Sequence, residues 1–234
     1  GAMDCAVSRS RSAWLIASDT PDWLVDGHEH SGLSWGAVAN VLWDPITLST
    51  ADLLQGWKTV YPGALHLPDG RNRTVWSPVQ AARQSTSMTT DDLRETVDEA
   101  VAGLTRRRSS LLVEVSGGLD SAIMAASLRA IGFDEKVLWL NTHGPYPESD
   151  ERAYATAVAE ALGVRLTILS RSARDLAKGL TLEHPRSFRP SLNRLDAAYD
   201  ALQADLCEAH GVEGVLTGKG GDVAFLQTAS SSIL

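Results

Sequence analysis

The stretch that decides the fold reads LLVEVSGGLDS and covers residues 111–121. Its first part, residues 111–115, is a mostly apolar run of the kind that forms a buried strand. Gly117 and Gly118 then allow a tight turn in which the backbone can approach an anion closely. A helix that begins after this turn presents free N–H groups and the positive end of its dipole. The stretch therefore predicts a phosphate site between a strand and a helix.

Three polar side chains in this stretch point to the same chemistry. Ser116 and Ser121 can donate hydroxyl hydrogen bonds to phosphate oxygens. Asp120 alone would repel a phosphate, so a carboxylate here is explained by Mg²⁺, which would in turn hold the phosphates. The motif lacks the Gly-Lys-Ser/Thr ending of a Walker A loop. The alternative is a glycine turn in which Asp and Ser cap a helix; the full motif in its strand–loop–helix context favours the phosphate site.

Predicted strands and helices alternate along the rest of the chain. Strands are predicted over residues 111–115, 136–141, 164–169 and 212–217, and helices over residues 120–131, 149–162 and 196–210. This alternation predicts an α/β fold, a parallel sheet with helices on both faces. Ligands of such sheets bind at the carboxyl ends of the strands, which is where the glycine motif lies.

A second glycine-rich motif, TGKGGD, follows the last predicted strand at residues 217–222. Its final residue, Asp222, gives a second carboxylate at the same sheet edge as Asp120, so both are candidate metal ligands. Lys219 could contact an α-phosphate or an acyl-adenylate, because a flexible ammonium group suits a phosphoryl group. The alternatives are a turn Asp and a solvated turn Lys.

The N-terminal part of the chain has a different pattern. Short strands bounded by turn residues are predicted over residues 14–17 and 60–67. Residues 33–43 have the apolar spacing of a helix. These elements indicate an α+β piece.

The stretch over residues 77–90 is polar and is predicted to be a linker. Thr90 is predicted to be the N-cap of the next helix, whose first turn carries Asp91 and Asp92. We therefore expect one domain over residues 4–80, a linker over residues 81–92 and a second domain over residues 93–234.

Composition excludes several classes of function. The 234-residue chain has a formal net charge of −8, and an acidic chain is a poor binder of nucleic-acid phosphates. No apolar run approaches the ~20 residues that cross a bilayer, so we expect no membrane partner. The two cysteines, Cys5 and Cys207, have neither metal-ligand spacing nor a disulfide pattern, which favours a cytoplasmic location.

The SGGLDS motif resembles the PP-loop of ATP pyrophosphatases, in the form found in asparagine synthetases and their relatives. The resemblance implies an adenine nucleotide alpha hydrolase-like fold that binds ATP and Mg²⁺ and releases pyrophosphate. In that family a glycine-rich segment ending in Asp completes the site, which makes Asp120 and Asp222 the metal ligands. We expect Asp120 and Lys219 to act in catalysis. The residues expected to bind the nucleotide are Val113, Ser116, Gly117, Gly118, Leu119, Asp120, Ser121, Leu140, Gly218 and Gly220.

Other segments resemble lasso peptide cyclases. These are residues 149–166, which read SDERAYATAVAEALGVRL, then residues 189–191 and residues 218–234, in which Lys219 interrupts the usual glycine run. The resemblance implies adenylation of an Asp or Glu side chain of a precursor peptide, then attack by the peptide's N-terminal amine to close a macrolactam ring. Expected partners are a precursor peptide or small carboxylate, and a leader-peptide-binding or protease protein. The alternatives are an asparagine or β-lactam synthetase, or a non-catalytic fragment that binds a nucleotide or a partner.

Residues 57–76 resemble the end of the glutaminase-like domain that precedes the synthetase domain in this family. We therefore expect the first domain to be a partial glutaminase-like domain, and the second to be truncated at its C-terminus. Cys5 is the only candidate for a glutaminase nucleophile, but its flanking residues depart from the family pattern and an ordinary thiol is favoured. The remaining polar candidates, each with a surface-loop alternative, are His28, Glu29, His30, His143, Tyr146, Glu148 and Asp150.

Overall fold

The computed structural model describes residues 5–9, 13–18, 32–44, 51–84, 87–147, 150–172, 188 and 197–220. The chain forms two compact units, Gly1–Ser87 with Glu183–Leu192, and Met88–Leu182 with Asn193–Leu234. Within the described ranges, no helix has both the length and the apolar character needed to cross a membrane.

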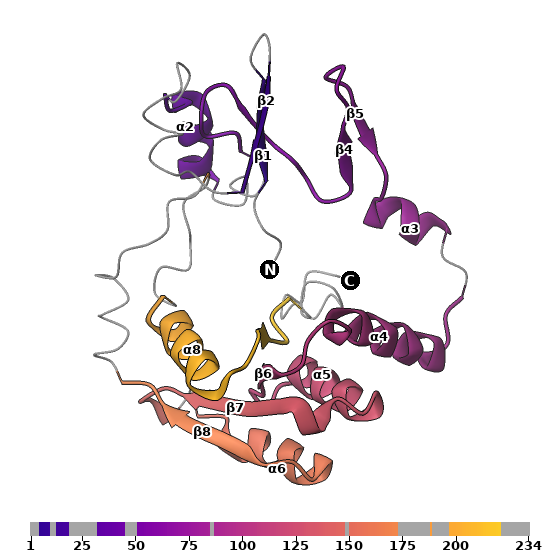
Figure 1. Cartoon of the computed structure of the whole chain (residues 1–234), viewed down its shortest axis with the longest axis vertical. Helices are drawn as coiled ribbons and strands as arrows, with labels where there is room; N and C mark the ends of the chain where they lie inside the picture. Colours follow the sequence, from indigo (N-terminus) through magenta and orange to yellow (C-terminus); the bar gives the residue numbers. More distant parts are fainter. Residues whose placement is uncertain are drawn as a thin grey trace. The chain divides into compact units, whose positions relative to one another are not determined.

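The larger unit is built on a four-stranded parallel sheet in the order β8-β7-β6-β9 (Figure 1). Its strands are β6 (Leu111–Glu114), β7 (Val137–His143), β8 (Leu166–Ser170) and β9 (Val215–Leu216). The helices are α4 (Thr90–Thr105), α5 (Leu119–Ala130), α6 (Arg152–Leu162) and α8 (Ala197–His210), and a short 3-10 helix, η2 (Asp134–Lys136), leads into β7. The predicted α/β fold is confirmed, with element ends within a few residues of those expected.

Helices cover both faces of this sheet. Successive side chains along β6 point to opposite faces, so the strand contacts helices on both sides. Val113 and Val115 belong to the core cluster that also contains Leu128 of α5. Glu114 points to the other face, where its carboxylate accepts a hydrogen bond from the hydroxyl of Tyr199 on α8. The face toward α5 is therefore largely apolar, and the face toward α8 carries polar groups near its carboxyl edge.

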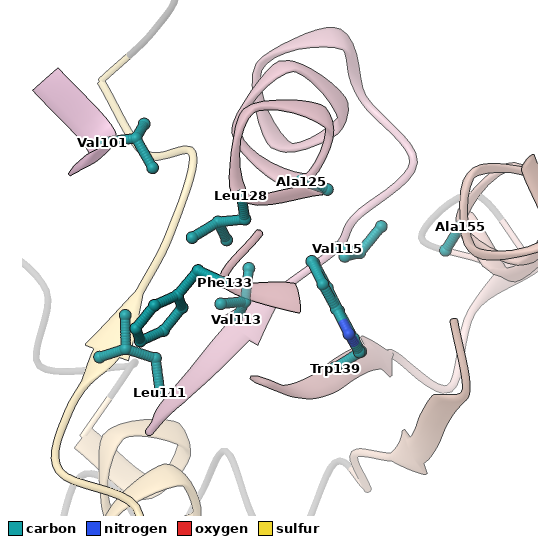
Figure 2. Close-up of a cluster of buried hydrophobic side chains, with 9 residues drawn as sticks. All are labelled: Val101, Leu111, Val113, Val115, Ala125, Leu128, Phe133, Trp139 and Ala155. Carbon is teal, nitrogen blue, oxygen red and sulfur yellow. The ribbon is translucent and has the colours of Figure 1, made fainter. Parts of the chain in front are cut away.

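The core of the larger unit lies between the sheet and helices α4, α5 and α6. Figure 2 shows its buried side chains, which are Val101, Leu111, Val113, Val115, Ala125, Leu128, Phe133, Trp139 and Ala155. They come from three helices, two strands, the residue directly after β6 and the turn before η2, so the cluster joins the main elements of the larger unit. Because α5 begins at the glycine motif, this core also fixes the position of the helix that carries it.

The smaller unit contains two antiparallel sheets. Strands β1 (Ala6–Arg9), β2 (Trp14–Ala17) and β3 (Trp57–Thr59) pair in the order β2-β1-β3, and β4 (Ala64–His66) forms a hairpin with β5 (Asn72–Thr74). The unit also has helices α2 (Trp35–Trp43) and α3 (Pro78–Gln84). Ala6, Trp57 and Phe188 form its buried cluster, and the rings of Trp57 and Phe188 are 4.9 Å apart.

One prediction for the smaller unit is wrong. The strand expected over residues 60–67 is interrupted by a turn, so only β4 remains of it. The turn is imposed at Gly63, whose φ of +77° suits glycine and where a Cβ would lie 2.2 Å from the carbonyl oxygen of Trp76. The stretch expected to be a linker over residues 77–90 contains helix α3, and the boundary between the two compact units falls inside it, after Ser87.

The N-cap of α4 is Thr89 rather than the predicted Thr90. Thr89 Oγ1 accepts a hydrogen bond from the Asp92 N–H at 3.2 Å, while the Asp92 carboxylate accepts one from the Thr89 N–H at 2.8 Å. This reciprocal capping box selects Thr89, because only that threonine stands three residues before an acidic side chain in register to return the bond.

Removing a core side chain should destabilise the larger unit. Leu128 is fully buried, so Leu128→Ala is expected to lower the free energy of unfolding by about 2–5 kcal/mol. Leu104→Ala is the matched control, since Leu104 lies on α4 with 61 % of its surface exposed, and should change it by no more than about 0.5 kcal/mol. Urea unfolding followed by circular dichroism measures both; equal effects would contradict this description of the core.

Candidate functional site

Two loops meet at the carboxyl edge of the parallel sheet. One connects β6 to α5 and carries Ser116, and the other follows β9 and carries Gly218. The strand order reverses at β6, because β7 and β8 lie on one side of it and β9 on the other. Ligands of open α/β sheets bind at such a reversal. The structure thus brings the two sequence motifs together at the place where this architecture binds ligands.

Backbone packs so closely around the first loop that two positions must be glycine. Gly117 has a φ of +95°, and a Cβ there would lie 2.6 Å from the Cβ of Tyr154 at the start of α6. A Cβ on Gly218 would lie 2.7 Å from the backbone nitrogen of Ser121. Both distances are shorter than side chains tolerate, so α6 packs directly on the first loop and the second loop packs directly on the first turn of α5.

The first loop is held by its own serines. The N–H of Ser116 donates to Ser121 Oγ at 3.2 Å, and the two hydroxyl oxygens lie 3.1 Å apart. Ser121 Oγ donates to the carbonyl of Gly118 at 3.0 Å, while Ser116 Oγ accepts from the Gly118 N–H at 3.2 Å. The hydroxyls expected to bind phosphate therefore bond within the loop in this structure, and binding a phosphate through them would require these bonds to rearrange.

The N-terminus of α5 offers backbone donors. Its N-cap is Gly118, which provides no side-chain cap, and the first intrahelical bond runs from the Ala122 N–H to the Gly118 carbonyl at 3.1 Å. The N–H groups of Leu119, Asp120 and Ser121 come before that bond and have no partner inside the helix. Together with the helix dipole they favour an anion.

Asp120 has the environment of a cation ligand. Its Oδ1 is buried and has no hydrogen-bond partner among the described residues. An unpaired buried carboxylate oxygen is unfavourable, and a bound cation would remove that cost. Mg²⁺ is commonly held by one or two carboxylates together with phosphates, so Asp120 fits such a role. Asp222, the other expected ligand, lies outside the described residues.

Among the described residues, no group of three or more His, Cys, Asp or Glu side chains is placed so that it could hold a metal ion.

Val113 and Leu140 lie inside the sheet, away from the loop surface. Both side chains are fully buried, and the Leu140 carbonyl accepts a hydrogen bond from the Val115 N–H at 2.8 Å. The contact expected with the nucleotide runs through backbone atoms of these two strands, and it stays a prediction. Leu119, by contrast, is 60 % exposed at the start of α5.

The second loop places Lys219 and Gly220 next to Gly218. Lys219 is exposed, and its backbone N–H donates to Thr217 Oγ1 at 3.3 Å. Gly220 has a φ of +99°, a conformation that favours glycine. Lys219 therefore stands in the loop that touches α5, from which a long side chain can reach a group bound there.

A polar cluster on the α8 face of the sheet was not predicted from the sequence. Besides the bond between Tyr199 and Glu114, the guanidinium of Arg171 lies 4.9 Å from the centre of the Tyr199 ring. Burial raises the pKa of the Tyr199 hydroxyl, and the hydrogen bond to Glu114 raises it further. The cluster attaches α8 to the carboxyl edge of the sheet. The sequence signal that could have indicated it was a charged residue at the end of each of two predicted strands.

The remaining sequence candidates stay predictions for the site. Cys5 is a half-buried free thiol in the smaller unit. His143 Nδ1 lies 3.0 Å from the Gly144 carbonyl, and Tyr146 is exposed. Asp150 pairs with Arg152 at 2.6 Å, which lowers the pKa of Asp150 to about 2. The candidates outside the described residues are His28, Glu29, His30 and Glu148.

Comparisons with known proteins place the larger unit in context. Residues 92–229 match the family model described as asparagine synthase. No match was found among curated proteins.

Three solved structures are similar to this chain. The NH3-dependent NAD synthetase from Campylobacter jejuni, in complex with nitrate, is 15 % identical over 58 % of this chain and 60 % of its own, with a TM-score of 0.44. The glutamine-dependent NAD⁺ synthetase from Acinetobacter baumannii, in complex with ADP, is 16 % identical over 77 % and 34 %, with a TM-score of 0.46. The NMN synthetase from Francisella tularensis is 11 % identical over 61 % and 60 %, with a TM-score of 0.43. The chain thus spans about one third to three fifths of these proteins.

The close packing of the second loop against α5 can be tested by adding one methyl group at Gly218. Gly218→Ala is expected to lower the free energy of unfolding by about 1–3 kcal/mol, because the Cβ meets backbone atoms of α5 that cannot move aside cheaply. Gly214→Ala is the matched control, since its nearest contact is a side-chain atom of Leu111 at an ordinary 3.5 Å. Urea unfolding of both variants measures the difference; similar values would show that the second loop does not pack against α5.

Proposed function

Because the chain belongs to the asparagine synthase family, we propose that it acts in ATP-dependent amide-bond formation, by activating a carboxylate as an acyl-adenylate. The observation that carries this proposal is the glycine loop between β6 and α5. It presents uncapped N–H groups at a helix N-terminus, and Gly218 of the second loop is seated against the same turn. Such a turn suits the phosphates of a nucleotide.

The proposed reaction has two steps. A carboxylate oxygen attacks the α-phosphorus of ATP, the bond from that phosphorus to the bridging oxygen breaks, and pyrophosphate leaves. An amine then attacks the acyl carbon, the bond to AMP breaks and the amine loses a proton. In the first step negative charge builds up on the leaving pyrophosphate, and N–H groups already oriented at the α5 N-terminus stabilise that charge without reorganisation.

In this proposal Asp120 and Asp222 hold Mg²⁺, and the buried, unpaired Oδ1 of Asp120 supports the first assignment. The bound ion would neutralise charge on the phosphates. Lys219 lies in the loop that reaches α5 and is assigned to the α-phosphate or the acyl-adenylate, where an ammonium group would offset negative charge.

We propose that the carboxylate is an Asp or Glu side chain of a precursor peptide and that the amine is the N-terminus of the same peptide. Support comes from the resemblance of residues 149–166 and 218–234 to lasso peptide cyclases. The first of these segments contains α6, whose residue Tyr154 borders Gly117 of the loop. The product would be a macrolactam ring, and a leader-peptide-binding or protease protein would be the expected partner.

The reaction predicts a specific loss in Asp120→Asn. Pyrophosphate release from Mg·ATP should fall by about 10²-fold or more, because the variant loses the charge that holds the metal. Asp91→Asn is the matched control: Asp91 also lies in the first turn of a helix, α4, but outside the two loops. It should keep the wild-type rate, measured with a coupled pyrophosphatase assay, and equal rates in the two variants would contradict the role of Asp120.

The substrate class is tested in the same assay with a peptide that has a free N-terminus and one internal Asp. The peptide should stimulate release, and its Asn-containing twin should not. Stimulation by free aspartate alone would favour an asparagine synthetase instead, and binding of ATP without any release would indicate a non-catalytic nucleotide-binding chain.

A further inference from the structure

One buried polar side chain next to the anion loop lies outside both sequence motifs. Asn141 is on β7, only 2 % exposed, and lies on the same face of the strand as Trp139 of the core. An apolar residue would be the ordinary occupant of such a position, because an amide loses its hydration there.

The Asn141 amide makes one bond, and that bond is to the start of the loop. Its Nδ2 donates to the carbonyl of Val115 at 2.7 Å. Its Oδ1 is buried and has no partner among the described residues. Because Val115 offers a carbonyl, the amide must present its NH2 group there. The NH2 group of the side chain thus has a hydrogen-bond partner, whereas the unpaired carbonyl oxygen lowers the stability of the folded chain.

The bond controls the first peptide unit of the loop. The N–H of Val115 continues the strand pairing by donating to Leu140, but its carbonyl is taken by the Asn141 side chain. The N–H of the following residue, Ser116, donates to Ser121 Oγ. The peptide plane between Val115 and Ser116 is therefore held from both sides by side chains, one from β7 and one from α5.

We propose that Asn141 is a positioning residue for nucleotide binding, which sets the direction of the loop's first peptide plane without touching the ligand. A peptide plane held at both ends cannot rotate, so the loop is preorganised before an anion arrives. The retained unpaired Oδ1 is explained by this role, since a residue chosen for stability alone would be apolar. The identity of the ligand, a nucleotide, rests on the proposed function. The positioning of the peptide plane rests on the loop geometry alone.

Three variants test it in the full chain. Asn141→Leu removes the amide at similar volume, and Asn141→Asp keeps the shape but replaces the donor by an acceptor. Gln203→Leu is the matched control, because Gln203 is also a buried amide with an unpaired atom, but it lies on α8 away from the loop.

Calorimetric titration with Mg·ATP should show affinity lowered about tenfold or more in both Asn141 variants and unchanged in Gln203→Leu. Asn141→Leu and Gln203→Leu each remove a buried unpaired atom, but Asn141→Leu also leaves the Val115 carbonyl without its partner, so the affinities are compared at a temperature at which thermal unfolding shows every variant to be folded. Equal affinity in wild type and Asn141→Leu, or an affinity loss that only follows a loss of stability, would overturn the proposal.

Hydrogen exchange of the Ser116 N–H gives a readout that needs no ligand. It should exchange about tenfold faster in Asn141→Leu than in wild type, as expected for loss of one hydrogen bond that holds the peptide, and at the wild-type rate in Gln203→Leu. If the wild type binds no Mg·ATP, the proposed function fails while this exchange still decides the role of Asn141. Unchanged exchange would refute the positioning role even if nucleotide binding is normal.

Discussion

The contact on which the rest of the site depends is the meeting of backbone with backbone around the N-terminus of α5. A side chain at Gly117 would collide with the start of α6, and a side chain at Gly218 would collide with Ser121. Because neither glycine carries a Cβ, three segments far apart in the sequence close on one helix end. The uncapped N–H groups of that end lie beside these close backbone contacts, and free N–H groups at a helix N-terminus favour an anion.

The sheet beneath supports this contact in two different ways on its two faces. Toward α5 the packing is apolar, and Val113, Val115 and Leu128 hold the helix against the strand that leads into the loop. Toward α8 the attachment is polar, through the bond between Tyr199 and Glu114. The polar face lies at the carboxyl edge, where it fastens the helix that precedes β9 and the second loop.

The larger unit could be predicted from the sequence because its signals are strong and repeated: apolar strands, amphipathic helices and two glycine motifs in order. The smaller unit was harder, since strands of three or four residues carry little periodicity and a turn such as that at Gly63 depends on its contact with Trp76. The sequence identified the residues of the two loops but not the contacts that those residues make. The signal for Asn141 was present, one amide inside an apolar strand, but its bond to Val115 depends on register between strands that sequence does not specify. Asp222 lies outside the described residues, so its role stays a prediction.

The central claim is that this chain forms an acyl-adenylate, and isotope exchange between labelled pyrophosphate and ATP tests it most directly. Exchange requires adenylation to run forward and backward and does not require the amine to react. The account predicts Mg²⁺-dependent exchange that appears when a peptide with an internal Asp is added and is absent with its Asn-containing twin. Exchange without any carboxylate, or ATP binding with no exchange in the presence of the peptide, would contradict it.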